Sequence, residues 1–229
     1  GPLDILINNA AQTVRRSPGS YAAISAAESE PLPDSELPEL EFLGGRSAAG
    51  ELTAGSTTID AGGLVPDTAP TNSWSDRVHE VLPLELLEVQ LCNVTAPFVL
   101  VSRLRAAMAA SPYPRRYVVN VSAMEGVFSR GYKGAGHPHT NMAKAALNML
   151  TRTSAAEMFT DGILMTSVDT GWITDERPHP TKLRLHEEGF HAPLDLVDGA
   201  ARVYDPIVRG EQGEDVYGCF LKDYAPIAW

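Results

Sequence analysis

Cysteine and basic residues are scarce in this chain of 229 residues, and each shortage argues against a class of function. The two cysteines, Cys92 and Cys219, lie far apart and have no Cys or His at metal-ligand spacing, so a zinc site is not expected. Both lie in apolar segments, which predicts buried, reduced thiols and a cytoplasmic or other reducing intracellular compartment. Only 18 Lys and Arg stand against 29 Asp and Glu, and the formal net charge of -11 disfavours nucleic acid and anionic lipid as partners.

Long hydrophobic runs and a targeting segment are also lacking. No uninterrupted apolar run reaches the roughly 18 residues that span a bilayer, so a membrane partner is not expected. The first residues, Gly1-Pro2-Leu3-Asp4, have neither the basic region nor the apolar stretch of a signal peptide. With 44% hydrophobic and 21% charged residues, the chain has the composition of a globular protein and the length of one well-buried domain.

Short apolar segments alternate with helical patterns along most of the chain. We expect strands at residues 3–9, 117–121, 163–168 and 216–221, and helices at residues 83–110, 141–159 and 195–208. One side of the first helix carries Leu87, Leu91, Thr95, Phe98 and Ser102. Strands separated by helices of this size predict an α/β fold, with a mostly parallel sheet and helices on both faces. Ligands of such sheets bind at the carboxyl ends of the strands.

Residues 14–72 interrupt this alternation with Pro, Gly, Ser, Ala and acidic residues. Unstructured loops of that length are rare within compact domains. We therefore interpret the segment as an insertion, a lid or a partly flexible part of a single domain that spans residues 1–229. The segment directly follows the first expected strand, where it could cover a site, but its composition does not indicate a ligand.

Five short motifs occur at the expected strand ends and helix starts. They are Asn8-Asn9-Ala10-Ala11, Asn93, Val119-Asn120-Val121-Ser122 with Gly126, residues 140–147 with Thr140 and Lys144, and residues 168–174 with Gly171 and Thr174. Together they resemble the short-chain dehydrogenase/reductase (SDR) family over residues 3–174 outside the insertion. The resemblance implies a Rossmann-like fold and NAD(P) as cofactor. It places the catalytic positions at Asn93, Ser122, Thr140 and Lys144, and the cofactor-binding positions at Asn9, Ala10, Lys144, Gly171 and Thr174.

Two positions depart from the family pattern where its proton chemistry takes place. The family has a tyrosine four residues before the lysine, on the same helix face, where the ammonium favours the phenolate. Thr140 stands there, and an aliphatic hydroxyl is a far weaker acid than tyrosine, whose pKa is about 10. The family's serine position falls on Ala123. Because neighbouring strand residues point to opposite faces, we expect Ser122 to point away from the site unless the strand has already ended.

The family's Gly-rich turn, which seats a pyrophosphate on a helix amino terminus, is missing from this chain. The resemblance therefore implies an incomplete fold without its first βαβ unit, and NAD(P) binding only together with that amino-terminal half. The strand at residues 3–9 would then present an open edge. A complementing chain, self-association or an upstream segment of a longer protein would cover it, and we favour the upstream segment. By resemblance, the helices at residues 83–110 and 141–159 would form the face of a homo-oligomer.

Three functional hypotheses remain open. The first is an NAD(P)-dependent oxidoreductase with an altered proton donor, for which Tyr132, His137 and His139 lie in the connection before Thr140. The second is a non-catalytic scaffold or subunit that reuses the fold. A hydrolase using Ser122, His137 and Asp169 is the weakest, because Ser122 lies in no Gly-x-Ser-x-Gly turn.

Overall fold

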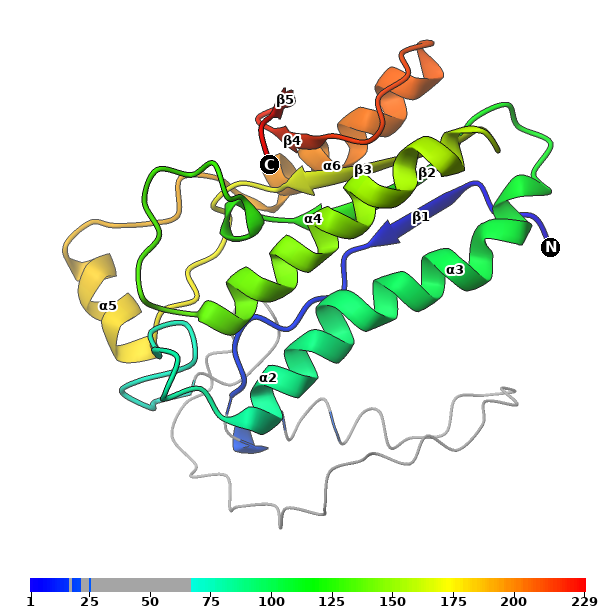
Figure 1. Cartoon of the computed structure of the whole chain (residues 1–229). Coiled ribbons are helices and arrows are strands. Elements are labelled where there is room, and N and C mark those ends of the chain that lie inside the picture. Colours follow the sequence, from blue (N-terminus) through cyan, green and yellow to red (C-terminus); the bar gives the residue numbers. More distant parts are fainter. Residues whose placement is uncertain (17, 22–24, 26–66) are drawn as a thin grey trace.

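The computed structural model describes residues 1–16, 18–21, 25 and 67–229, and the fold is drawn in Figure 1. Most of the expected insertion, residues 14–72, therefore lies outside the described residues. Five strands form one sheet in the order β1-β2-β3-β4-β5. They are β1 (Ile5–Asn8), β2 (Arg116–Ser122), β3 (Ile163–Asp169), β4 (Phe220–Lys222) and β5 (Ala225–Ile227). The first four run parallel and β5 is antiparallel to β4, so the chain has the expected α/β fold with a mostly parallel sheet.

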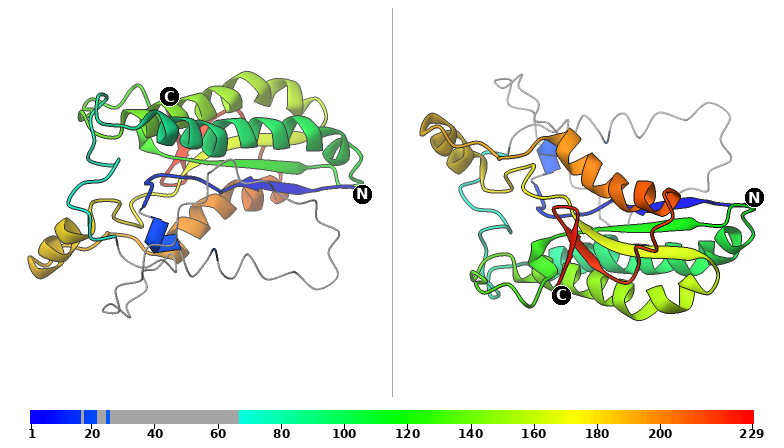
Figure 2. Two further views of the ribbon diagram at one scale, coloured as in Figure 1. Left: turned by 90° about the horizontal axis from the view of Figure 1, so that it is seen from below. Right: turned by 90° about the horizontal axis from the view of Figure 1, so that it is seen from above.

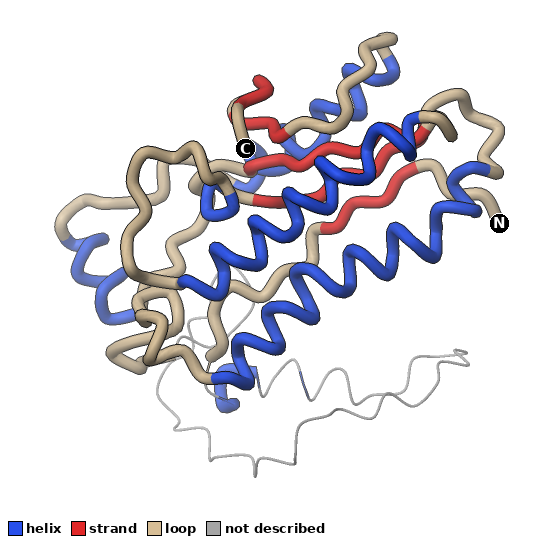
Figure 3. The backbone as a smooth tube through the Cα atoms, viewed as in Figure 1, coloured by secondary structure: helices blue, strands red, loops and turns tan. Residues whose placement is uncertain are grey.

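Helices cover both faces of this sheet, as Figure 2 shows. The helical segments are η1 (Pro18–Tyr21), α2 (Pro83–Gln90), η2 (Leu91–Thr95), α3 (Ala96–Ala109), η3 (Met124–Gly126), α4 (Pro138–Phe159), α5 (His179–Glu187) and α6 (Leu196–Glu211). Helices α3 and α4 lie on one face and α6 on the other, while α5 lies beyond the carboxyl ends of the strands (Figures 1 and 3). The crossovers connect parallel neighbours, as parallel pairing requires.

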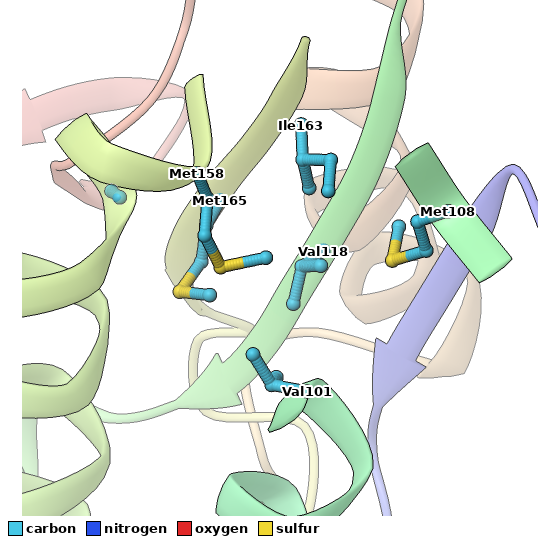
Figure 4. Packing of buried hydrophobic residues seen from close by; sticks show 7 residues of the cluster. Val101, Met108, Val118, Met158, Ile163 and Met165 are labelled. Atoms are coloured by element: carbon cyan, nitrogen blue, oxygen red, sulfur yellow. The ribbon is translucent and has the colours of Figure 1, made fainter. Parts of the chain in front are cut away.

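The central strands are apolar because they are buried on both faces. Every residue of β2 and β3 is buried, which accounts for the Tyr-Val-Val-Asn-Val and Ile-Leu-Met runs. One core cluster lies under α3 and α4 and includes Met108, Val118, Met158, Ile163 and Met165 (Figure 4). Helix α4 ends at Phe159 and Gly162 follows at φ +70°, a left-handed conformation that lets the chain turn directly into β3.

The long helix at residues 83–110 is present, but it contains a π-helical turn and presents its predicted side to solvent. Segments α2, η2 and α3 are continuous in sequence. The residues of the predicted side, Leu87, Leu91, Thr95, Phe98 and Ser102, are all exposed, with Leu87 at 59% and Phe98 at 57%. The sheet contacts instead involve the side that carries Val101 and Met108. Both sides are apolar, so periodicity could not decide which one faces the core.

The continuous helix Pro83–Ala109 is long and apolar enough to cross a membrane, by length and composition alone. Charged residues interrupt its apolar run, which is why no uninterrupted run was found in the sequence. Cys92 and Cys219 are free but only partly buried, not fully. The last expected strand, residues 216–221, is shortened to β4, and neither β5 nor α5 was expected from the sequence.

Candidate functional site

The expected site residues gather at one edge of the sheet, because the carboxyl ends of parallel strands meet there. Asn9 and Ala10 follow β1 and are exposed, Ser122 ends β2, and Gly171 and Thr174 follow β3. Strands β1, β2 and β3 are adjacent in the sheet. This edge is the place where ligands of open α/β sheets bind.

Lys144 reaches from α4 to the end of β2. Its side chain is buried, and its Nζ donates a 2.9 Å hydrogen bond to the main-chain oxygen of Val121. Burial lowers the pKa of Lys144 to about 8, opposed by the more distant charge of Glu125. The lysine is thus held at the strand end by one neutral acceptor. With a pKa of about 8, its amino group is partly neutral near physiological pH.

Thr140 lies one helical turn before Lys144 on α4. The residue is buried, and within the part of the chain that the structure describes its Oγ1 has no hydrogen-bond partner. The same holds for both ring nitrogens of the neighbouring buried His139, whose pKa is lowered by burial. Unpartnered buried polar atoms are uncommon, so the start of α4 is a place where a ligand or water would find free donors and acceptors.

The other two candidate proton donors are placed differently. His137 begins α4 in a left-handed conformation and stacks on Trp74, with ring centroids 3.9 Å apart. Its Nδ1 lies 2.9 Å from the Trp74 oxygen, and its main-chain N–H donates to Asp76. His137 therefore anchors the segment after the insertion onto α4. Tyr132 is an exposed loop residue.

Ser122 points toward α4 rather than to the opposite face. Its hydroxyl donates a 2.6 Å hydrogen bond to Oδ1 of Asn148, one turn after Lys144, and the Asn148 amide donates to the Gly126 carbonyl. Ala123, at the family's serine position, has an extended backbone. A hydroxyl committed to a buried amide joins β2 to α4, and the hydrogen bond leaves its proton unavailable to a substrate in this conformation.

Asn93 connects the long helix to the loop after β1. It lies in the π-helical turn η2 and is buried. Its Oδ1 accepts from the Gln12 N–H at 2.7 Å and its Nδ2 donates to the Gln12 oxygen at 2.8 Å. Single π-helical turns occur often at functional sites. Here the turn places one side chain so that it satisfies both main-chain groups of a residue just beyond Asn9 and Ala10.

Gly171 and Thr174 complete the edge beyond β3. Gly171 has φ +77°, and a Cβ there would approach the Leu194 side chain to 2.5 Å, so the position requires glycine. The Thr174 hydroxyl donates to Glu176. Asp169, the third residue of the hydrolase hypothesis, is paired with Lys222 at 3.2 Å. Among residues 1–16, 18–21, 25 and 67–229 no group of His, Cys, Asp or Glu is arranged to hold a metal ion.

A hollow beside this edge was not expected from the sequence. It has a volume of about 350 Å³, and its lining includes Arg15, Arg16, Arg177, His179 and Lys182. A second hollow of about 540 Å³ shares Arg15, Arg16 and Glu176 with it and continues to Ala11. The available signal was the placement of basic residues shortly after two strands in an otherwise acidic chain.

Comparison with solved structures shows the same fold over most of the chain. An SDR protein of Burkholderia multivorans with bound NADP matches with a TM-score of 0.50 and 18% identity, covering 72% of this chain and 62% of that one. The carbonyl reductase Sniffer of D. melanogaster matches with a TM-score of 0.52 and 23% identity, covering 68% and 61%. The angucycline C-6 ketoreductase LanV with bound NADP matches with a TM-score of 0.51 and 17% identity, covering 96% and 60%. The chain is therefore structurally similar to SDR proteins.

Sequence comparison identifies a longer relative. The uncharacterized protein R665 of Acanthamoeba polyphaga mimivirus is 30% identical over 213 residues, which is 90% of this chain and 44% of the relative. The chain thus spans less than half the length of that protein, and about three fifths of the solved chains named above. No family model matches the sequence.

Proposed function

We propose that this chain forms the substrate half of an NAD(P)-binding, SDR-like domain whose usual proton relay has been lost. The observation that carries the proposal is the 2.9 Å hydrogen bond from Lys144 to Val121 beside an unpartnered Thr140 hydroxyl. The lysine is in place at the strand end, but the acid that it would activate is missing. Any oxidoreductase activity is therefore atypical or absent.

The residues present fit one end of a nicotinamide nucleotide. Lys144 offers N–H donors to ribose hydroxyls, and Asn9, Ala10, Gly171 and Thr174 border the same edge. Two of the solved neighbours were determined with bound NADP, which supports this choice of cofactor. A bound nicotinamide would supply or accept a hydride. The opposite end of the cofactor needs a Gly-rich turn, which the described residues lack, so we assign it to polypeptide that pairs with β1.

The open edge of β1 supports this division of the cofactor site. β1 lies at the end of the described sheet, and the side chains of Ile5 and Ile7 are each 43% exposed. An unpaired apolar edge strand favours pairing with another strand. A preceding segment of a longer protein, or a complementing chain, would bury these side chains and bring the pyrophosphate turn.

The test is a calorimetric titration of NADH and NADPH into the longest natural polypeptide that contains this sequence. We expect saturable binding of at least one of the two, weakened tenfold or more by Lys144→Met. Lys133→Met is the matched control, because Lys133 also donates to main-chain oxygens but lies in the exposed loop after β2. Absence of binding by both nucleotides would refute the proposal.

An activity assay of a Thr140 variant tests whether the threonine hydroxyl serves as an altered proton donor or takes no part in catalysis. Thr140→Val keeps the shape of the side chain and removes only the hydroxyl. If any carbonyl reduction is measurable, we expect the variant to retain it within a factor of two, since the threonine hydroxyl is too weak an acid to contribute. Loss of the activity would instead make Thr140 the proton donor.

A non-catalytic scaffold is the second candidate, and the exposed apolar side of α2 and α3 favours it. Leu87, Leu91 and Phe98 are each more than half exposed there, with Met142 and Met149 on the neighbouring α4. Apolar patches of this kind usually mark interaction surfaces. We propose a second copy of the chain as the partner, because the surface is formed by two neighbouring helices that a symmetry-related pair would cover.

Sedimentation velocity tests this assembly. The wild-type chain is expected to form dimers that Leu91→Lys disrupts, whereas Leu183→Lys, an exposed leucine on α5, leaves the distribution unchanged. Monomers at all concentrations, or association of the chain with lipid vesicles in place of dimers, would contradict the proposed partner.

A further inference from the structure

We propose that the hollow lined by Arg15, Arg16, Arg177, His179 and Lys182 is a binding site for a small anionic substrate, a carboxylate or a phosphate. The inference rests on the proposed function in one respect only, the assignment of the ligand as substrate. The cavity and the charges of its lining residues define the site by themselves. The chain as a whole carries a net charge of -11, so a cavity with this lining departs from the rest of the molecule.

One wall of the cavity is the segment after β1, which acidic side chains of α2 hold in place. Glu85 is buried and accepts a 2.9 Å hydrogen bond from the Arg15 N–H. Glu88 accepts from the Gln12 side chain and pairs with Arg15 at 3.2 Å. These carboxylates therefore fix the backbone that presents the two arginines.

The other wall comes from the chain after β3. The Glu176 carboxylate accepts a hydrogen bond from the Thr174 hydroxyl, and the Glu176 main-chain oxygen accepts one from the Asn72 side chain. Asp67 accepts from the Ala69 N–H. The acidic lining residues Asp67, Glu85 and Glu176 are thus each engaged with donors of the chain itself.

Three of the basic lining residues, Arg177, His179 and Lys182, are less committed than these carboxylates. Lys182 and His179 make no side-chain hydrogen bond or ion pair within the described part of the chain, although both border the cavity. Arg177 has one long ion pair, at 3.5 Å to Asp175, and its guanidinium lies 5.4 Å from the Trp172 ring centroid and 5.0 Å from that of Phe190. The two rings orient a planar group that binds carboxylate or phosphate with two parallel hydrogen bonds.

The position of the cavity fits a substrate rather than a remote effector. The neighbouring second hollow shares Arg15 and Arg16 with it and is also lined by Ala11, directly after the candidate cofactor residues Asn9 and Ala10. The cavity therefore lies beside a hollow that borders the edge at which a nicotinamide would lie. An anionic group held by Arg177 and Lys182 would leave room in the cavity for the remainder of a small molecule.

The experiment measures binding of inorganic phosphate and of succinate to the whole chain by calorimetry at constant ionic strength, with uncharged succinamide as comparator. We expect at least one anion to bind, succinamide not to bind, and the pair Arg177→Gln with Lys182→Gln to weaken binding tenfold or more. Arg184→Gln is the matched control, because Arg184 lies two residues from Lys182 on α5 but pairs with Glu188 outside the cavity. Its affinity should change less than twofold.

Each outcome decides the proposal. Binding of phosphate alone or succinate alone supports the site and identifies the preferred group. Binding of neither anion, or equal loss in the control variant, overturns it. Circular dichroism and thermal unfolding establish that each variant is folded. Titration of NADH and NADPH into the longest natural polypeptide that contains this sequence separates the two claims: an anion site without binding of either nucleotide refutes only the proposed function, and the reverse refutes only this site.

Discussion

Asn93 holds the main-chain N–H and oxygen of Gln12, 81 residues earlier, with hydrogen bonds of 2.7 and 2.8 Å. The contact joins the π-helical turn of the long helix to the loop after β1. Because this loop continues into the wall of the basic cavity, one buried amide positions both the candidate cofactor residues and Arg15.

Asn93→Ala is expected to destabilise the chain by about 2–4 kcal/mol, because it leaves both polar groups of the Gln12 main chain without partners. Chemical denaturation measures the loss, and hydrogen exchange should show the Gln12 amide unprotected. Gln12→Ala is the control, since it keeps both main-chain bonds and removes only the contact with Glu88. Equal destabilisation by the two variants would contradict the role given to Asn93.

Gly126→Ala is expected to separate η3 from α4. A Cβ at this position would lie 2.4 Å from the carbonyl carbon of Lys144 and 2.6 Å from its oxygen, where only backbone could move. We expect a loss of stability of about 3 kcal/mol or more, of the size caused by severe overpacking. Gly131→Ala has no atom within 4 Å of the added carbon and should change the melting temperature little. A well-tolerated Gly126→Ala would show that this packing is wrong.

Asn120 connects strands β1 and β3 through side chains. Its Oδ1 accepts from Asn8 at 2.7 Å, its Nδ2 donates to Thr151 at 2.9 Å, and Thr151 contacts Ser167 at 2.8 Å. Asn120→Ala should cost about 3 kcal/mol, because two buried partners lose their bonds and a cavity forms. Urea unfolding checks this against Asn9→Ala, an exposed neighbour expected to change stability by less than about 0.5 kcal/mol. A similar loss of stability in both variants would show that this side-chain network does not stabilise the sheet.

Lys144 makes stability depend on pH. Burial lowers its folded-state pKa to about 8 from 10.5, so between these values the unfolded chain binds the extra proton and stability rises with pH. Below pH 8 the folded state carries the full penalty of the buried charge, about 3 kcal/mol. The lost bond to Val121 offsets about 1 kcal/mol of this, so Lys144→Met should be about 2 kcal/mol more stable than wild type at pH 7.

The advantage of Lys144→Met should vanish and then reverse slightly as the pH approaches 10.5, because the penalty of the buried charge is nearly gone there while the variant still lacks the bond to Val121. Urea unfolding of the two proteins at pH 7 and pH 10.5 makes the comparison, and other titrating groups cancel in the difference. A difference in stability that stays constant with pH would mean that Lys144 is not a buried charge.

Elements whose apolar pattern has a single interpretation were predicted correctly from the sequence. The prediction failed where the pattern was compatible with two interpretations. Strands β2 and β3 follow from runs such as Tyr117 to Val121, and α4 from its composition and the Gly162 exit. The side of α2 and α3 that faces the sheet was ambiguous because Phe98 and Val101 are both apolar. The turn into β5 places both Asp223 and Tyr224 at positive φ, a conformation that tyrosine rarely adopts.

The candidate site was predictable in position but not in detail. Motif order placed Asn93, Ser122, Thr140 and Lys144 near one strand edge. No sequence pattern indicated that Asn148 would accept the hydrogen bond of the Ser122 hydroxyl, because that contact depends on how the side chains of β2 and α4 are aligned. The basic cavity joins residues more than 160 positions apart, and only tertiary packing brings them together.

The most direct test of the central claim is nucleotide binding by the natural polypeptide that contains this sequence, followed through the fluorescence of NADPH or NADH. The account predicts saturable enhancement for at least one nucleotide, at least tenfold weaker affinity in Lys144→Met, and unchanged affinity in Thr140→Val. Fluorescence that stays at the level of free nucleotide for both cofactors, in a protein shown to be folded, would contradict it.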